Sequence, residues 1–274
     1  MRRAADTAPI PTLPRGTCLP INRCNLPARI LGGLAFQRQP APLALDGVTT
    51  LHADLFARLD RIETAADRAR QFRDYLTVHF TLEDPAAAGY AKGGRGRPKA
   101  TWERILRGWF FDTDSREGAV LKAWVESRFG LLPRYHGGPI RDFSGDTYRA
   151  YLEARARGLY NTNALEAQLD LVYSYCQYEL QRGEQTHLQL YRGVNRLEQL
   201  EWLREGDEPV VLLNNLNSFS SDPERASEFG DRVARIRVPV EKVFCYQRLF
   251  PGLLEGEGEQ MVIGGLYRVE GWAY

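Results

Sequence analysis

The sequence predicts an α+β fold in which a helical N-terminal lobe precedes a mostly antiparallel β core. Up to about residue 182, apolar side chains recur at three- and four-residue steps, the spacing that forms one face of a helix. From residue 183 onward, short apolar or alternating runs are separated by turn residues, which is the pattern of strands. Helices and strands that are segregated along the chain in this way are typical of α+β domains.

The composition is that of a soluble globular protein, with 274 residues, a net charge of +1, 43% hydrophobic and 26% charged residues. A net charge this close to zero produces no strong electrostatic attraction to nucleic acid. No apolar run is long enough for a membrane-spanning helix. The N-terminus lacks the apolar stretch of a secretory signal, and the four scattered cysteines favour a reducing compartment and lack zinc-site spacing. We therefore expect a cytoplasmic protein without a metal, nucleic-acid or membrane partner.

The first 182 residues are expected to form an arm and a lobe. Residues 1–46 are rich in proline and glycine and predict an irregular arm, followed by a mainly helical lobe over residues 47–182. The predicted helices are Leu51–His79, Ala100–Phe111, Gly118–Phe129, Asp146–Arg157 and Ala164–Arg182. Their aromatic stripes, such as Trp102 with Trp109, are typical of packed cores rather than of cofactor sites. The basic segment Lys92–Lys99 predicts an exposed loop, because it lacks the spacing of a phosphate loop.

Residues 183–274 predict the β core, with apolar or alternating runs bounded by turn residues. The strands are expected at His187–Arg192, Pro209–Leu213, Arg232–Val238, Val243–Gln247, Glu259–Ile263 and Leu266–Trp272. One short helix interrupts them, with Asp222 as its N-cap, Pro223 as its first residue and the run to Phe229 following.

The first polar feature of the β core is Arg192, which ends an apolar strand between Tyr191 and Gly193. The planar guanidinium suits a phosphate group, and glycine lets a ligand approach the backbone closely. Taken alone, this pattern favours an edge arginine in a surface ion pair.

Two further features add hydroxyl and carboxylate groups. Ser218 and Ser220 face the same way on an extended segment, and Phe219 faces the other way, although such a run is also typical of a helix-capping turn. Glu257 and Glu259 project from one face on the approach to a strand, roughly 6.5–7 Å apart along the chain. Two like charges so close repel each other, which indicates a functional pair, with a solvated acidic turn as the alternative.

Together and in this order, the three features resemble the Arg–Ser–Glu pattern of the ADP-ribosyltransferases related to cholera toxin and the clostridial binary toxins. The residues that carry the pattern are Tyr191-Arg192-Gly193, Ser218-Phe219-Ser220 and Glu257-Gly258-Glu259. The whole chain, including residues 14–23, is similar to the dinitrogenase reductase ADP-ribosyltransferases of nitrogen-fixing bacteria. The resemblance implies a single domain over residues 1–274, with a split β-sheet of the ADP-ribosyltransferase type that carries an NAD site within residues 183–274.

The resemblance implies transfer of ADP-ribose from NAD to an arginine of a target protein. The implied target is the nitrogenase iron protein (dinitrogenase reductase), which the modification would switch off reversibly, and a PII-type signalling protein is the implied regulator. A guanidinium is protonated and a poor nucleophile, so Glu257 is expected to bind it and to take a proton. Family members that modify other side chains tend to carry glutamine at this position, which makes Glu257 an argument for arginine.

The remaining roles follow from what the NAD chemistry needs. Glu259 is expected to hydrogen-bond the ribose as its carbon becomes cationic, and Ser218 to orient Glu259. Arg192 is expected to hold the pyrophosphate, and either Phe219 or Phe229 to stack on the nicotinamide. The residues expected to bind NAD are Tyr191, Arg192, Gly193, Ser218, Phe219, Ser220 and Phe229.

Alternatives remain open at this point. Glu255 and Glu257 could be the acidic pair instead, although Glu259 directly adjoins the strand that begins at Met261. The resemblance implies that the loop Arg248–Leu254 contacts the protein substrate through exposed Phe250, Leu253 and Leu254, with ordinary packing of these apolar side chains as the alternative. The same residues could also serve an NAD glycohydrolase, in which water attacks, or a non-catalytic module that only binds NAD.

Overall fold

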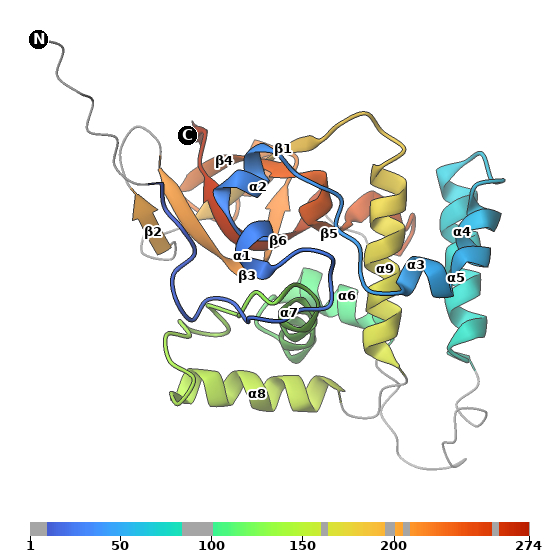
Figure 1. Cartoon of the computed structure of the whole chain (residues 1–274), viewed down its shortest axis with the longest axis horizontal. Helices are drawn as coiled ribbons and strands as arrows, with labels where there is room; N and C mark the ends of the chain where they lie inside the picture. Colours follow the sequence, from blue (N-terminus) through green and yellow to red (C-terminus); the bar gives the residue numbers. More distant parts are fainter. Residues whose placement is uncertain are drawn as a thin grey trace, which may run out of the picture.

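The helices of the N-terminal lobe precede the sheet, as predicted. The computed structural model describes residues 10–83, 101–159, 164–194, 201–204, 209–253 and 258–273 (Figure 1). The helices of the N-terminal part are α1 (Ala28–Leu31), α2 (Leu34–Arg38), α3 (Val48–Leu51), α4 (Ala53–Leu59), α5 (Ala65–His79), α6 (Trp102–Phe111), α7 (Arg116–Phe129), α8 (Asp146–Leu159) and α9 (Leu165–Leu180).

Side-chain caps fix where the main helices begin. The hydroxyls of Thr64, Thr101 and Ser115 accept a backbone N–H in the first turn of α5, α6 and α7. The single helix predicted over Leu51–His79 is wrong, because Thr64 adopts an extended backbone conformation and starts a new helix there. The other predicted helices of the lobe are confirmed to within a few residues at each end.

The second half of the chain forms a seven-stranded sheet whose paired strands run antiparallel. The strands are β1 (His187–Val194), β2 (Glu201–Arg204), β3 (Val210–Ser220), β4 (Arg232–Pro239), β5 (Val243–Tyr246), β6 (Glu259–Arg268) and β7 (Gly271–Ala273). Their order is β5-β6-β3-β1-β4-β7, with β2 beside β3. Strands β1 and β3 meet where Tyr191 pairs with Ser220, so this contact joins two halves of the sheet. The predicted α+β class with an antiparallel core is confirmed.

The strands differ from the prediction at four points, one of which is that the predicted strand Leu266–Trp272 joins the end of β6 to β7. The sequence does not predict β2, it ends β3 too early, and it divides β6 into two strands. Strand β3 continues because Asn215 buries its amide by donating to the backbone carbonyls of Lys122 and Leu131, at 2.7 and 3.0 Å. Strand β6 continues through Gly264 because the Asn214 carbonyl of β3 lies where a Cβ would stand, 1.7 Å away. Glycine here serves close strand packing rather than a turn.

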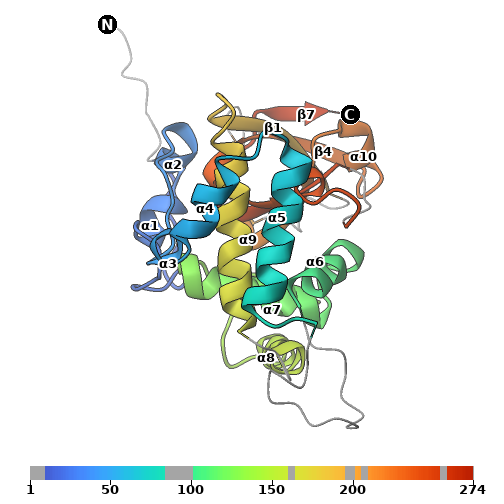
Figure 2. The ribbon, with the colours of Figure 1, turned by 90° about the vertical axis from the view of Figure 1, so that its right-hand side faces the viewer.

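Helix α9 lies between α5 and the sheet (Figures 1 and 2). The hydroxyl of Tyr173 and the amide of Gln177 donate to backbone carbonyls beside and within β5, each at 2.8 Å. On the other side of α9, Glu179 pairs with the buried Arg68 of α5 at 2.6 Å. These contacts fix the helical lobe against the half of the sheet that contains β5 and β6.

Residues 10–46, predicted to be irregular, contain α1 and α2 and pack on the sheet. The backbone N–H of Leu266 donates to the Gly32 carbonyl at 2.7 Å, and Gln37 accepts the backbone N–H of Arg268 at 2.8 Å. One cluster of buried hydrophobic side chains includes residues of the arm, the helices and the sheet. Such a shared core is what the predicted single domain requires, and the domain division itself stays a prediction.

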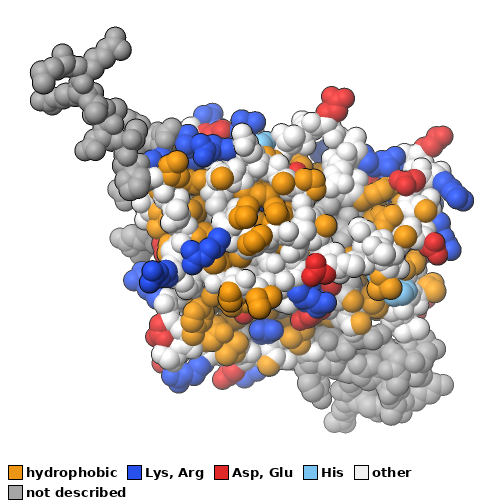
Figure 3. Space-filling model, viewed as in Figure 1, with side chains coloured by type: hydrophobic (Ala, Val, Ile, Leu, Met, Phe, Trp, Pro, Cys, Tyr) orange, Lys and Arg blue, Asp and Glu red, His pale blue; other side chains and the backbone are white. Residues whose placement is uncertain are grey.

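On the face of the molecule that Figure 3 shows, groups of hydrophobic side chains are interspersed with charged ones. The four cysteines are free thiols, of which Cys24, Cys176 and Cys245 are buried. Among the residues that the structure describes, no helix combines the length and apolar character needed to cross a membrane.

Candidate active site

Three strands bring the predicted arginine, serine and glutamate together. Ser220 of β3 pairs with Tyr191 of β1 on one side and with Glu259 of β6 on the other. Arg192 donates from Nη1 to the backbone carbonyl of Ser218 at 2.7 Å, and the Ser218 hydroxyl donates to a carboxylate oxygen of Glu259. Motifs that are far apart in the sequence therefore form one connected polar site.

Glu259 is partly buried, and its environment changes its acidity. Burial raises the pKa of this carboxyl to about 7, while hydrogen bonds from Ser218 and Trp109 and the charge of Arg192 oppose the rise. The carboxyl therefore keeps its proton to a higher pH than an ordinary glutamate does. A perturbed carboxyl beside an arginine is the kind of group that active sites use.

The Arg192 guanidinium is enclosed by the site. Burial lowers its pKa, and the charges of Glu259 and Asp114 oppose this effect, so the side chain stays a cation. Its Cζ lies 5.9 Å from the centroid of the buried Phe219 ring. Its Nε is buried and has no hydrogen-bond partner within the described part of the chain. A buried cationic donor without a partner fits an anionic ligand group such as a phosphate.

The backbone after Arg192 is closely covered by α10 (Pro223–Ser227), whose predicted N-cap is confirmed. The Asp222 carboxylate accepts the backbone N–H of Glu224 at 2.9 Å. A Cβ added at Gly193 would lie 2.0 Å from the backbone carbonyl of Ala226, so glycine is needed for this packing. The motif glycine therefore acts by letting α10 pack beside the arginine.

The aromatic and hydroxyl residues of the predicted NAD site have different surroundings. Phe219 is 2% exposed and packs in the core, whereas Phe229, just after α10, is 66% exposed. Ser220 is buried, and its hydroxyl accepts the backbone N–H of Asp222 at 3.0 Å. The Tyr191 hydroxyl accepts from the Gln189 amide. Of the two phenylalanines, only Phe229 is open to a ligand.

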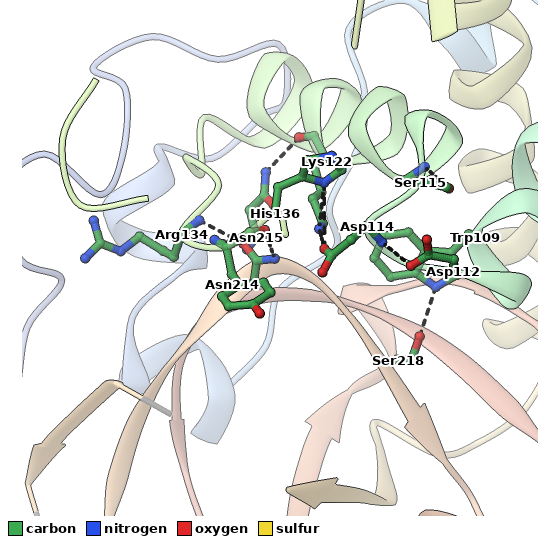
Figure 4. Close-up of polar contacts among 12 residues, drawn as sticks. Trp109, Asp112, Asp114, Ser115, Lys122, Arg134, His136, Asn214, Asn215 and Ser218 are labelled. Carbon is green, nitrogen blue, oxygen red and sulfur yellow. Dashed lines mark hydrogen bonds and ion pairs between the residues drawn. The ribbon is translucent and has the colours of Figure 1, made fainter. Parts of the chain in front are cut away.

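Trp109 of α6 is a site residue that the sequence does not single out. Its indole Nε1 donates to the Ser218 hydroxyl oxygen at 3.0 Å (Figure 4). Because this oxygen accepts from Trp109, the hydroxyl hydrogen is directed toward Glu259. The only sequence signal is that a buried indole N–H needs a partner, and that signal does not identify Ser218.

The acidic turn before Glu259 is only partly described. Glu257, Glu255 and Leu254 lie outside the described residues, so the choice between the two acidic pairs stays a prediction. Gly258 has φ +76°, a conformation that favours glycine, and its N–H donates to the Gln247 side chain. The turn therefore enters β6 with a fixed backbone at Gly258.

The predicted exposed contact patch before this turn is wrong for the two residues that the structure describes. Phe250 and Leu253 are 0% and 5% exposed. The Phe250 ring stacks near Phe72 of α5 and Tyr175 of α9, with centroids 5.8 and 5.7 Å apart. Apolar residues in this short segment anchor it to the helical lobe, which a local sequence pattern cannot distinguish from surface exposure.

The antiparallel sheet, with arginine, serine and glutamate on β1, β3 and β6, places the protein in the Arg–Ser–Glu class of ADP-ribosyltransferases. The family model described as dinitrogenase reductase ADP-ribosyltransferase matches residues 21–271, and the chain belongs to this family. It is also 38% identical over 259 residues to the NAD(+)–dinitrogen-reductase ADP-D-ribosyltransferase of Rhodospirillum rubrum, across 91% of this chain and 93% of that protein. No solved structure matches the chain.

Proposed function

We propose that this protein transfers ADP-ribose from NAD to an arginine of dinitrogenase reductase and thereby inactivates it. The observation that carries the proposal is the Glu259 carboxyl held by the Ser218 hydroxyl beside the Arg192 guanidinium. The name of the Rhodospirillum rubrum relative, which states dinitrogen reductase as the acceptor, supports the choice of target. Regulation by a PII-type protein stays a prediction from the family resemblance.

In this proposal Arg192 and Phe229 hold NAD. The unpartnered Nε of Arg192 is a donor for the pyrophosphate, and the buried Phe219 ring behind it limits where the guanidinium can move. Phe229 is exposed close to Gly193, where it is available to stack on the nicotinamide ring. Phe219, by contrast, supports Arg192 from the core.

The carboxylate form of Glu259 supplies the charge for the chemical step. Nicotinamide leaves as a neutral ring, taking the bonding electron pair, so its departure needs no general acid. The ribose carbon becomes cationic, as in glycoside hydrolysis, and a fixed nearby carboxylate stabilises that charge. Ser218 and Trp109 contribute by fixing the carboxylate and by opposing the rise in its pKa.

The acceptor arginine needs a second carboxylate, for which we propose Glu257. A guanidinium nitrogen attacks the ribose carbon, forms the new C–N bond and loses a proton, which Glu257 takes. Glu257 directly precedes Gly258, whose backbone has a positive φ, and stands two residues before Glu259, the first residue of β6. In a glycohydrolase the attacking group is water, so no carboxylate is needed to bind a guanidinium.

The test is a transfer assay with labelled NAD and purified dinitrogenase reductase. We expect label on the reductase with the wild type and with the control Glu153→Gln, which lies on the exposed face of α8. Glu259→Gln should abolish both transfer and NAD cleavage, whereas Glu257→Gln should abolish transfer and spare slow NAD hydrolysis. Release of free ADP-ribose by the wild type without any labelled protein would favour the glycohydrolase. Absence of NAD turnover, with NAD binding retained, would favour the binding module.

A further inference from the structure

A buried lysine lies behind the candidate active site. The Lys122 side chain of α7 is 1% exposed, and its Nζ is 2.8 Å from Oδ1 of Asp114 in the α6–α7 turn (Figure 4). Its Nζ also donates to Nδ1 of His136 at 3.2 Å. Burial, assisted by the charge of Lys122, lowers the pKa of His136 to about 4, so this ring is neutral and accepts. The cluster therefore consists of one ammonium and one carboxylate, with a neutral imidazole.

This cluster is mechanically connected to the site through Trp109. The Lys122 ammonium lies 5.9 Å from the centroid of the Trp109 ring, and the indole N–H of the same side chain bonds to Ser218. The backbone of α7 is also fixed, because Asn215 of β3 donates to the Lys122 carbonyl at 2.7 Å. Strand β3 thus carries Ser218 and, three residues earlier, Asn215, which holds the backbone of Lys122.

The cluster is also electrostatically connected to the site. Burial lowers the pKa of both Lys122 and Arg192; the charge of Asp114 opposes this on both side chains, and the charge of Arg192 lowers the pKa of Lys122 further. The Asp114 side chain is 28% exposed and Lys122 only 1%, so the carboxylate is the member of the pair that solvent or a ligand reaches. Asp112 lies in the same turn and adds a second negative charge near Lys122.

A negative charge near Arg192 weakens the binding of a ligand that carries a pyrophosphate. An uncompensated Asp114 would repel the two phosphate charges and would compete with them for Arg192. The Lys122 ammonium, held 2.8 Å from the carboxylate, offsets this charge. No hydrogen bond from Arg192 to Asp114 is needed for the effect, since Coulomb interactions act over several ångströms in a partly buried site.

We propose that Lys122 and Asp114 are positioning residues of the active site. The pair sets the charge beside Arg192 for the NAD pyrophosphate and, through Trp109, holds the Ser218 hydroxyl on Glu259. This inference rests on the proposed function, because it assigns the pair a role in the same NAD site. Neither residue touches the reacting atoms, and each acts through another side chain.

The experiment compares Lys122→Met, Asp114→Asn and the double variant by the NAD dissociation constant and by the KM for NAD. Loss of the ammonium should weaken NAD binding by about tenfold, the effect of one unit charge at a distance of about 10 Å and an effective dielectric constant of about 20. Loss of the carboxylate should change the affinity in the opposite direction, and the double variant should return toward the wild type. Glu153→Gln, an exposed carboxylate of α8, is the matched control and should leave both constants unchanged.

The pH profile of kcat/KM gives a second readout that a purely structural pair would not move. The groups that oppose the rise in the pKa of Glu259 are Ser218 of β3, Trp109 of α6 and Arg192 of β1, and the buried Cys245 thiol of β5 lies close enough for the charge of Glu259 to raise its pKa. Those around Lys122 are Asp112, Asp114, His136 and Arg192. The acid limb of this profile is the range in which kcat/KM rises with pH as Glu259 ionises. Removing the Lys122 cation should move this limb to higher pH, and removing the Asp114 anion should move it to lower pH.

The outcomes separate this inference from the proposed function. If both single variants lower the amount of folded enzyme while affinity and acid limb stay those of the wild type, the pair is structural and the inference fails. If Lys122→Met does not fold, Asp114→Asn decides, since an amide keeps a hydrogen bond to the ammonium. If the wild type itself shows no transfer, the proposed function fails, and the NAD dissociation constants alone decide the role of the pair.

Discussion

Replacing Glu259 by glutamine should make the protein inactive and, above neutral pH, more stable. The folded protein holds the Glu259 proton up to a pKa of about 7, whereas the unfolded chain releases it near the ordinary value of 4.5. Between these values the native state binds more protons, so stability falls as pH rises through the window from about 4.5 to 7. Glutamine has the shape of the protonated carboxyl and does not ionise, which removes this loss.

The magnitude follows from the same two pKa values. A change from 4.5 to about 7 corresponds to about 3 kcal/mol above pH 7. Glu259 is partly exposed, so we reduce this to about 2 kcal/mol for solvent screening. For a chain of this length that free energy raises the melting temperature by about 5 °C.

Thermal unfolding of wild type and Glu259→Gln at pH 4.5 and pH 8.5 measures the effect. We expect nearly equal melting temperatures at pH 4.5 and a gain for the variant at pH 8.5, while Glu153→Gln shows no such pH-dependent difference. In the wild type, kcat/KM should rise with an apparent pKa of about 7, leaving about a tenth of the plateau at pH 6. An equal stability difference at both pH values would refute the reasoning that burial of this carboxyl sets its pKa.

Three further substitutions test other parts of the site. Trp109→Phe removes the donor to the Ser218 hydroxyl and should lower kcat/KM about tenfold. It should also move the acid limb of the kcat/KM profile to higher pH, and an unmoved limb would contradict the role of the indole. Phe229→Ala should raise the KM for NAD several-fold without changing the melting temperature, because the ring is exposed, and an unaltered KM would remove it from the NAD site. Phe250→Ala should cost about 3–5 kcal/mol of unfolding free energy in denaturant titration, and a loss below about 1 kcal/mol would contradict its burial.

The helices and the site motifs were predictable because their signals are local. The cap at Asp222 with proline after it identifies the start of α10 from adjacent residues alone. The order of Arg192, Ser218 and Glu259 within strand-like segments identifies the family, since each motif is a few consecutive residues. A cap inside an apolar pattern is harder to see, and Thr64 therefore divides a predicted helix.

The tertiary structure decided which side chains meet and which are removed from water. Trp109 belongs to an apolar helical stripe, and only the packing of α6 on the sheet brings its N–H to Ser218. Phe250 looks like an exposed loop residue until its partners on α5 and α9 are known. The pKa of Glu259 depends on burial by several elements, which no local pattern records. The sequence by itself determined the fold class and predicted which residues carry the chemistry, whereas the geometry and charge of the site depend on contacts between distant segments.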